Sequence, residues 1–178
     1  MYELLGSEGV SARLVAPLAE MTFVGVFEEV LSRGIVFGVA EQSLGTWGAM
    51  ALSSLLFGLA HLPGEGATML SGLIAVVAGA FFAAAYVLTR RLWLCIAIHV
   101  AWNYTLGTVF SVAVSGRESV GLLRGRLTGP EWLTGGRYGL EASLLTLLVL
   151  LVVGAAFLWR AHARGHLVAP SWRRRAAA

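Results

Sequence analysis

Long apolar stretches with few charged residues dominate the chain. A membrane-spanning helix needs about 20 mostly apolar residues. Stretches near that length are expected as spans at residues 14–39, 46–61, 67–89, 92–114 and 140–159. Turn-forming or charged residues separate them at Gly45, Pro63-Gly64, Arg90-Arg91 and 115–139. The pattern therefore predicts an all-α fold, a polytopic transmembrane bundle of about five helices.

The amino-acid composition indicates whether water or lipid surrounds this bundle. The 178 residues are 57% hydrophobic and 13% charged, with a mean hydropathy of +0.76. A soluble domain averages roughly 45 to 50% apolar and about 25% charged residues. We therefore expect an integral membrane protein with a single domain over residues 1–178. Its expected parts are a motif-bearing core at 16–107, a C-terminal helix at 140–159 and an Arg-rich tail at 160–178.

The basic residues are all arginines and cluster at the end of the chain, where the last nineteen positions contain Arg160, Arg164, Arg173, Arg174 and Arg175. We interpret this tail, with His162 and His166, as solvated and close to anionic lipid. No aromatic-interleaved basic fold surrounds it, so nucleic-acid binding is not expected. The tail shares one predicted side with Arg90 and Arg91. The positive-inside rule then predicts a cytoplasmic C-terminus.

Three short polar motifs interrupt the apolar helices: FEEVLSRG, FGLAH and HVAWN. Their polar members are Glu28, Glu29, Arg33, His61, His99 and Asn103. A charged residue at the centre of a spanning helix costs about 2.5 to 3.5 kcal/mol on insertion scales, so such residues persist mainly where they face one another or a wet cavity. We therefore expect the three motifs to form one polar site inside the membrane.

Spacing separates the roles of the two adjacent carboxylates. Glu29 and Arg33 are four residues apart, so on a helix they share a face and can form an ion pair. Arg33 is therefore interpreted as structural support. Glu28 is rotated by about 100° from Glu29, so it cannot satisfy the same arginine in the same way. Glu28 is left free for chemistry.

The other two motifs repeat the four-residue spacing, with Phe57 and His61 on one face and His99 and Asn103 on another. Depth is harder to reconcile. Counted from the proposed cytoplasmic helix ends, Glu28 and Asn103 lie about 16 Å deep, His99 about 10 Å and His61 about 22 Å. On straight helices this spread is too large for all four to touch. Helix tilt, a break at a glycine or an unequal helix start is needed to bring them together.

At these residues the chain resembles the CPBP family of intramembrane proteases. That family includes the type II CAAX prenyl endopeptidases, the bacterial abortive-infection-like proteins and the bacteriocin-processing group. It shows E-E-x-x-x-R, F-x-x-x-H and H-x-x-x-N on successive core helices, and this chain matches all three in order. The resemblance extends over residues 16–107. The segment LTGPEWLTGGRYGLEASL is also similar to the ending of many bacterial members.

The resemblance implies an intramembrane endopeptidase in a bacterial cytoplasmic membrane. Its substrate would be a membrane-associated peptide or protein, such as a prenylated protein or a peptide precursor. Glu28 would act with His61 to activate a water, while His99 and Asn103 would polarise the scissile carbonyl and stabilise the oxyanion. Structural support would come from Glu29, Arg33 and Phe57.

Zinc is an open question for this site. Glu28, His61 and His99 supply three candidate ligands, which is the number that a catalytic zinc site takes from the protein. The family is often called metalloprotease for this reason. However, the chain has no H-E-x-x-H motif, and a Glu and His pair can activate water without an ion. We favour metal-independent catalysis.

Two other classes of function remain open. A non-catalytic membrane scaffold, for example a bacteriocin self-immunity protein, would retain the same residues. A small transporter or proton pathway would also place Glu, His and Asn inside a bundle. Transporters commonly show internal repeats or paired broken helices, and neither is visible here. Under each interpretation the expected partner is the lipid bilayer, and for a protease also a peptide or protein substrate.

Overall fold

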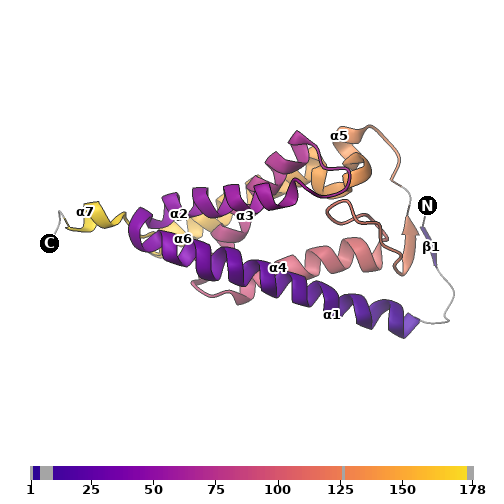
Figure 1. The fold of residues 1–178 in the computed structure, drawn as a ribbon, viewed down its shortest axis with the longest axis horizontal. Helices are drawn as coiled ribbons and strands as arrows, with labels where there is room; N and C mark the ends of the chain where they lie inside the picture. Colours follow the sequence, from indigo (N-terminus) through magenta and orange to yellow (C-terminus); the bar gives the residue numbers. More distant parts are fainter. Residues whose placement is uncertain (1, 5–9, 126, 176–178) are drawn as a thin grey trace.

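The computed structural model describes residues 2–4, 10–125 and 127–175, which are mostly helical (Figure 1). The long elements are α1 (Val10–Glu29), α2 (Gly38–His61), α3 (Met69–Thr89), α4 (Trp93–Asn103) and α6 (Leu144–Ala163). Two π-helical segments continue α1 and α4, namely η1 (Val30–Phe37) and η2 (Tyr104–Val109). Every span expected from the sequence therefore lies largely in helix.

Shorter elements follow the fourth long helix. Three of them close one end of the bundle, namely α5 (Glu131–Thr134), η3 (Gly136–Tyr138) and η4 (Leu140–Ala142), whereas α7 (Ser171–Arg175) lies at the other end of the molecule. Strands β1 (Tyr2–Leu4) and β2 (Leu123–Gly125) pair antiparallel. The helical prediction thus omitted one small two-stranded sheet.

Two helices in the described part of the chain are long and apolar enough to cross a membrane, α3 and α6. Their starts are set by side-chain caps. Thr68 and Ser71 form a capping box before α3, and Ser143 accepts a hydrogen bond from the backbone of Thr146 at the start of α6. Because two of the described helices meet the criterion for a membrane span, the five spanning helices expected from the sequence remain a prediction.

A bend at Gly45 reverses the chain between the first two expected spans. Gly45 has φ 70°, and a Cβ there would come within 2.7 Å of the backbone of Val168 and Pro170, so the bend requires glycine. Helix continues from η1 into the start of α2 as far as this bend. The predicted end of the first helix at Val39 was therefore too early, because residues 40–44 carry no helix-breaking signal.

Small residues let the helices approach α3 closely. A Cβ on Gly79 would lie 2.8 Å from the Cα of Ser54 on α2. Further along α3, Ala83, Ala84 and Ala85 are fully buried. Small interfacial residues of this kind are typical of membrane helix packing, and they place α3 at the centre between α2 and α6.

The chain beyond α6 folds back over the Gly45 end of the bundle. Thr46 and Val168 are joined by two hydrogen bonds of 2.9 and 2.8 Å. His166 donates from Nδ1 to the carbonyl of Val87 at 3.0 Å, and Arg90 donates to the carbonyl of His166. The prediction that His166 is solvated was wrong, because backbone groups exposed at the bend and at the end of α3 take partners from the tail.

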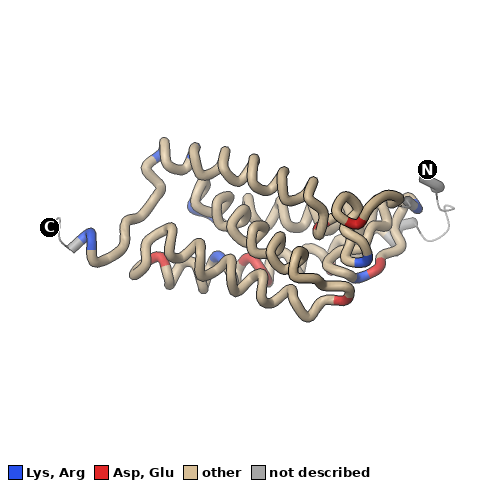
Figure 2. Tube along the Cα trace, turned by 90° about the horizontal axis from the view of Figure 1, so that it is seen from above, with Lys and Arg blue, Asp and Glu red and all other residues tan. Residues whose placement is uncertain are grey.

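Most charged residues lie towards the two ends of the molecule, and a smaller charged group lies along the middle of the bundle (Figure 2). Arg90 and Arg91 lie in the turn between α3 and α4, at the same end as the tail, where Arg174 donates to the carbonyl of Gln42. This is the shared side that the loop charges predicted.

Candidate active site

The polar centre of the bundle is a buried group of three side chains from α1, η1 and α4. Glu29 Oε1 accepts a hydrogen bond from Arg33 Nη1 at 3.1 Å and one from His99 Nδ1 at 2.9 Å. Glu29 and Arg33 are completely buried, and His99 is 5% exposed. The four-residue spacing thus gives the expected ion pair, and the same carboxylate also fixes the orientation of His99.

Aromatic rings enclose this group from α2 and α3. The Arg33 guanidinium carbon lies 4.6 Å from the ring centre of Phe57 and 5.2 Å from that of Phe82. Its Nη2 donates to the carbonyl of Gly79 at 2.7 Å. The ring of His99 stacks on Phe82 at 4.8 Å and 18°. Cation–π contacts and stacking of this kind supplement the hydrogen bonds of a desolvated charge.

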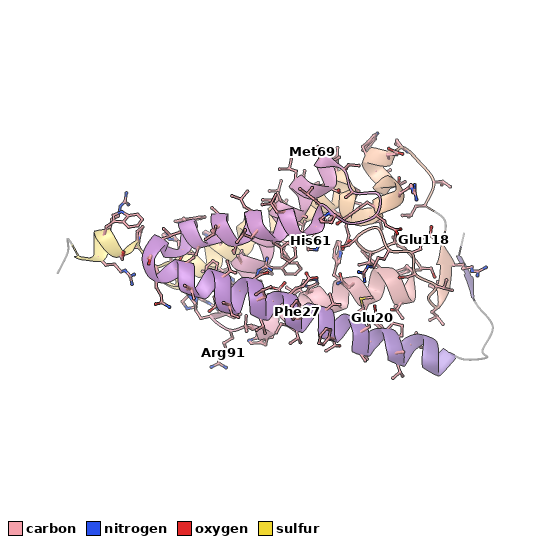
Figure 3. All side chains as sticks on the ribbon, in the orientation of Figure 1. Glu20, Phe27, His61, Met69, Arg91 and Glu118 are labelled. Carbon is pink, nitrogen blue, oxygen red and sulfur yellow. The ribbon has the colours of Figure 1, made fainter. Side chains whose placement is uncertain are left out.

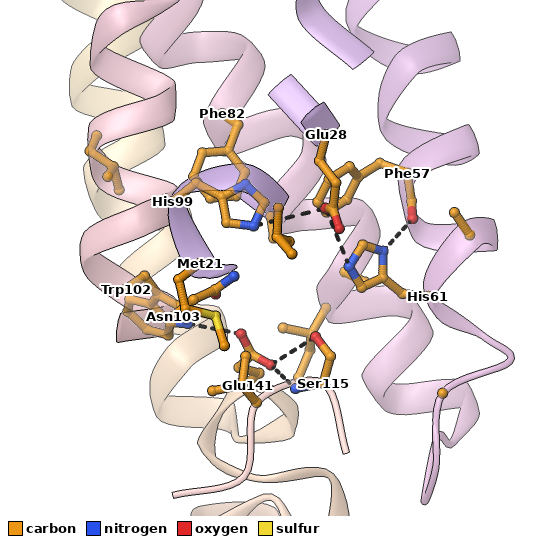
Figure 4. A pocket seen from close by; sticks show the side chains of 18 of the residues that line it. Met21, Glu28, Phe57, His61, Phe82, His99, Trp102, Asn103, Ser115 and Glu141 are labelled. Atoms are coloured by element: carbon orange, nitrogen blue, oxygen red, sulfur yellow. Dashed lines mark hydrogen bonds and ion pairs between the residues drawn. The ribbon is translucent and has the colours of Figure 1, made fainter. Parts of the chain in front are cut away.

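Two imidazoles turn the same nitrogen towards Glu28 (Figure 4). His61 Nε2 is 3.9 Å and His99 Nε2 is 3.8 Å from Glu28 Oε2. His61 Nδ1 lies 2.8 Å from the carbonyl of Phe57, which can only accept, so Nδ1 carries the proton. In the neutral ring Nε2 is then an acceptor. The same argument applies to His99, whose Nδ1 faces the carboxylate of Glu29.

Glu28 Oε2 is buried and has no hydrogen-bond partner among the described atoms. Its distances to the two imidazole nitrogens exceed a direct hydrogen bond, yet each gap is short enough for a water to bridge Glu28 and the imidazole. A water has two protons to donate to such a group of acceptors. The arrangement can therefore bind a water and take a proton from it.

The same atoms also offer ligands of the type that zinc prefers, with both Nδ1 protons held by acceptors as in many metal-bound histidines. Tetrahedral zinc with bonds of 2.0 to 2.2 Å sets ligand atoms about 3.3 Å apart. The separations of 3.8 and 3.9 Å between Glu28 and the two histidines are wider than that. No group of three or more His, Cys, Asp or Glu within the described residues is placed to hold a metal. As placed, these side chains do not fit zinc.

A cavity of about 1160 Å³ opens onto this group. Glu28, Phe57, His61, His99 and Asn103 all line it. Asn103 ends α4, one turn after His99, and is 5% exposed. The structure thus brings the predicted catalytic residues to one cavity, while Glu29 and Arg33 lie behind its wall.

The depth conflict disappears when helices are counted from the bend at Gly45. Glu28 precedes Gly45 by 17 residues and His61 follows it by 16, so the two are level across the antiparallel pair. The α4 helix also starts deeper than expected, because Arg90 in the preceding turn donates to Glu41 at 2.6 Å, one turn inside the bend. The unequal helix start, rather than a break at Gly34 or Gly58, accounts for most of the difference.

A second polar group lines the cavity further from His61 and was not found from the sequence. Glu141 in η4 accepts hydrogen bonds from Trp102 Nε1 at 3.0 Å and from the backbone of Ser115 at 2.5 Å. Nearby Tyr138 also lines the cavity, and burial raises the pKa of its phenol. No helical spacing links Trp102, Ser115 and Glu141. The Gly-rich segment at 115–139 connects Ser115 to Tyr138 but does not indicate that they lie close together.

The rim of the cavity carries further charge. Glu20 on α1 and Glu118 in the loop after η2 both line it and are both exposed (Figure 3). Most of the remaining lining is apolar and comes from α1, α2, α3 and α6. The cavity therefore joins a polar centre to apolar walls, as is usual for sites that bind amphipathic ligands.

Comparisons with known proteins agree with these motifs. The model of the family described as type II CAAX prenyl endopeptidase Rce1-like matches residues 11–105. This range covers more than half of the chain, and its bounds lie close to those of the expected core at 16–107. Curated proteins and solved structures gave no match.

Proposed function

Because the chain belongs to the type II CAAX prenyl endopeptidase Rce1-like family, we propose that it is an intramembrane endopeptidase that uses a water held by Glu28, His61 and His99. The observation that carries the proposal is the convergence of both Nε2 atoms on the unpartnered Glu28 Oε2. In the first step, the Glu28 carboxylate takes a proton from the water. The hydroxide then attacks the scissile carbonyl.

The developing oxyanion needs donors on the side of α4. This role requires His99 as the imidazolium, whose Nε2–H donates first to the water and then to the oxyanion and keeps its proton throughout, while the Asn103 amide donates beside it. Glu29 accepts the Nδ1 proton of His99 at 2.9 Å, so the ring keeps its orientation in both protonation states. Glu28 finally gives its proton to the leaving amine, which completes the hydrolysis and restores the carboxylate.

The mechanism takes no step through a metal. Exhaustive chelation tests this choice, with metal content measured on the same purified sample. We expect full activity after chelation. Loss of activity that zinc restores would overturn the metal-independent mechanism and would assign Glu28, His61 and His99 as ligands.

The substrate that we propose is a membrane-associated peptide or protein, prenylated or a peptide precursor. The apolar walls that extend from the polar centre support it.

For the topology, we propose a single domain of five spans in a bacterial cytoplasmic membrane. Arg90, Arg91 and the tail then face the cytoplasm. A fluorescent protein fused to the C-terminus should fluoresce because that end is cytoplasmic. A fusion without fluorescence would indicate the opposite orientation.

The decisive experiment compares the wild type with Glu28→Gln on a panel of fluorogenic peptides. Glutamine keeps the size of the side chain but cannot take the proton, so cleavage should fall by about 10²- to 10⁴-fold with little effect on folding. Glu131→Gln, at an exposed position of α5, is the matched control and should cleave as the wild type does. Undiminished cleavage by Glu28→Gln would refute Glu28 as the base, whereas a wild type that cleaves none of the peptides would favour the scaffold or self-immunity function.

A further inference from the structure

The carboxylate of Glu141 joins two segments that are far apart in the chain. Its Oε1 accepts from the indole of Trp102 on α4 at 3.0 Å. Its Oε2 accepts from Ser115 twice, from the backbone N–H at 2.5 Å and from the hydroxyl at 3.1 Å. Hydrogen bonds to an ionised acceptor are about twice as strong as neutral ones. Three donors on one carboxylate therefore make a firm connection between loop and helix.

The turn that Glu141 holds is strained and tightly fitted. Ser115 has φ 49°, a left-handed conformation that a serine keeps only with support from its surroundings. The next residue, Gly116, donates to the carbonyl of Tyr138 at 3.1 Å. A Cβ on Gly116 would lie 1.8 Å from the carbonyl oxygen of Glu65. The turn is thus closely confined, and the Glu141 carboxylate is one side chain that holds it in place.

The same connection reaches the helix that bears two of the proposed site residues. Trp102 directly precedes Asn103 and follows His99 by three residues on α4. Trp102, Ser115 and Glu141 all line the cavity that contains Glu28. In Figure 4 they lie together on one side of the cavity, apart from the pair of histidines. They form an end wall of the same space in which the peptide bond would react.

We propose that Glu141 is a positioning residue for substrate binding, which holds the Ser115 turn against Trp102 as the wall that receives the peptide segment next to the scissile bond. This inference rests on the proposed function. The wall combines the Trp102 indole with the Glu141 carboxylate and the Ser115 hydroxyl, a mixed apolar and polar lining that suits a peptide better than a purely apolar chain. Because Glu141 does not reach the reacting atoms, its loss should weaken binding more than turnover.

Glu141→Gln tests this directly. An amide presents one acceptor oxygen to three donors, and its NH₂ group then faces a donor. We expect KM to rise by about 10- to 100-fold, the value of one hydrogen bond to a charged group. We expect kcat to change by less than about threefold, which marks lost ground-state binding rather than lost chemistry. Glu131→Gln is the matched control and should keep both constants.

A second variant guards against a folding defect in the first. Trp102→Phe keeps an aromatic ring but removes the Nε1 donor and part of the indole, so KM should rise by less than in Glu141→Gln. If the two residues act through one contact, adding Trp102→Phe to Glu141→Gln should raise KM by less than the product of the two single effects. Additive effects in the double variant would overturn the connection.

Hydrogen exchange provides a measurement that does not depend on cleavage. In Glu141→Gln the backbone N–H of Ser115 should exchange faster, and unchanged exchange would refute the clamp. Faster exchange with unchanged KM, or a fall in kcat alone, would refute its role in substrate binding. A wild type that cleaves none of the peptides overturns the proposed function, whereas wild-type cleavage with an unaffected Glu141→Gln overturns this inference alone.

Discussion

The two polar groups at the cavity find their hydrogen-bond partners in different ways. The inner group, Glu29, Arg33 and His99, is almost completely buried, and its members pair with one another across helices. The outer group is centred on Glu141, which is half-buried and accepts from the backbone of Ser115 in a loop. The inner group finds its partners inside the protein, although Glu29 Oε2 and Arg33 Nε have none among the described residues, whereas the outer group can also use solvent.

This difference predicts which functions can be separated. A buried pair that loses one partner leaves an uncompensated charge, so the inner group is expected to determine folding and activity together. Loss of a partly exposed carboxylate leaves no buried charge behind. The outer group should therefore alter substrate binding without unfolding the bundle.

The largest expected effect is that of Arg33→Leu. Removal of the guanidinium leaves the Glu29 carboxylate buried with His99 as its remaining partner, so the free energy of unfolding should fall by about 3 to 5 kcal/mol. Folded yield and activity should fall together. Chemical unfolding in detergent micelles measures the first quantity and peptide cleavage the second.

Two variants sharpen this prediction. Arg91→Leu removes an arginine from an exposed turn and should leave the free energy of unfolding unchanged. Combining Arg33→Leu with Glu29→Gln removes both charges, so the double variant should recover part of the lost stability but not the activity, because Glu29 also orients His99. Normal stability of Arg33→Leu would show that the ion pair does not hold the inner group.

Asn103→Ala should have the next largest effect. Asn103 follows His99 of the inner group by four residues on α4 but adjoins Trp102, which bonds to Glu141 of the outer group, so it tests where the border between the two groups lies. Because Asn103 is the proposed donor to the oxyanion, its loss should lower kcat by about 10²- to 10³-fold. KM should stay close to the wild-type value. A rise in KM with normal kcat would place Asn103 in the outer group.

The inner group could be predicted from the sequence because its geometry is set by helical periodicity. Glu29 and Arg33 share a face at a spacing of four, and the cost of isolated charges in a membrane requires other polar motifs nearby. Phe82 was missed because a phenylalanine in an apolar helix gives no signal. The carbonyl of Gly79 was missed for the same reason.

The outer group could not be predicted, because tertiary contacts in a loop determine it. The Gly-rich segment at 115–139 marks a turn region, but nothing in it specifies that Ser115 meets Glu141 or that Glu141 also meets Trp102. The docking of His166 against α3 was hidden in the same way. The error at Gly45 differs, since the glycine was identified as a break and only the helix before it was ended too soon.

The smallest effect is expected for Phe82→Leu, which asks whether hydrogen bonding or packing orients His99. Leucine keeps the apolar bulk but removes the ring on which His99 stacks at 4.8 Å. Stacking contributes about 0.5 to 1.5 kcal/mol beyond buried area, so cleavage should fall only about 2- to 10-fold. Phe23→Leu, at a position that is 70% exposed on α1, controls for loss of a phenylalanine. If Phe82→Leu lowers kcat as much as Glu29→Gln does, the ring orients His99 as strongly as the carboxylate, and the inner group depends on packing as well as on charge.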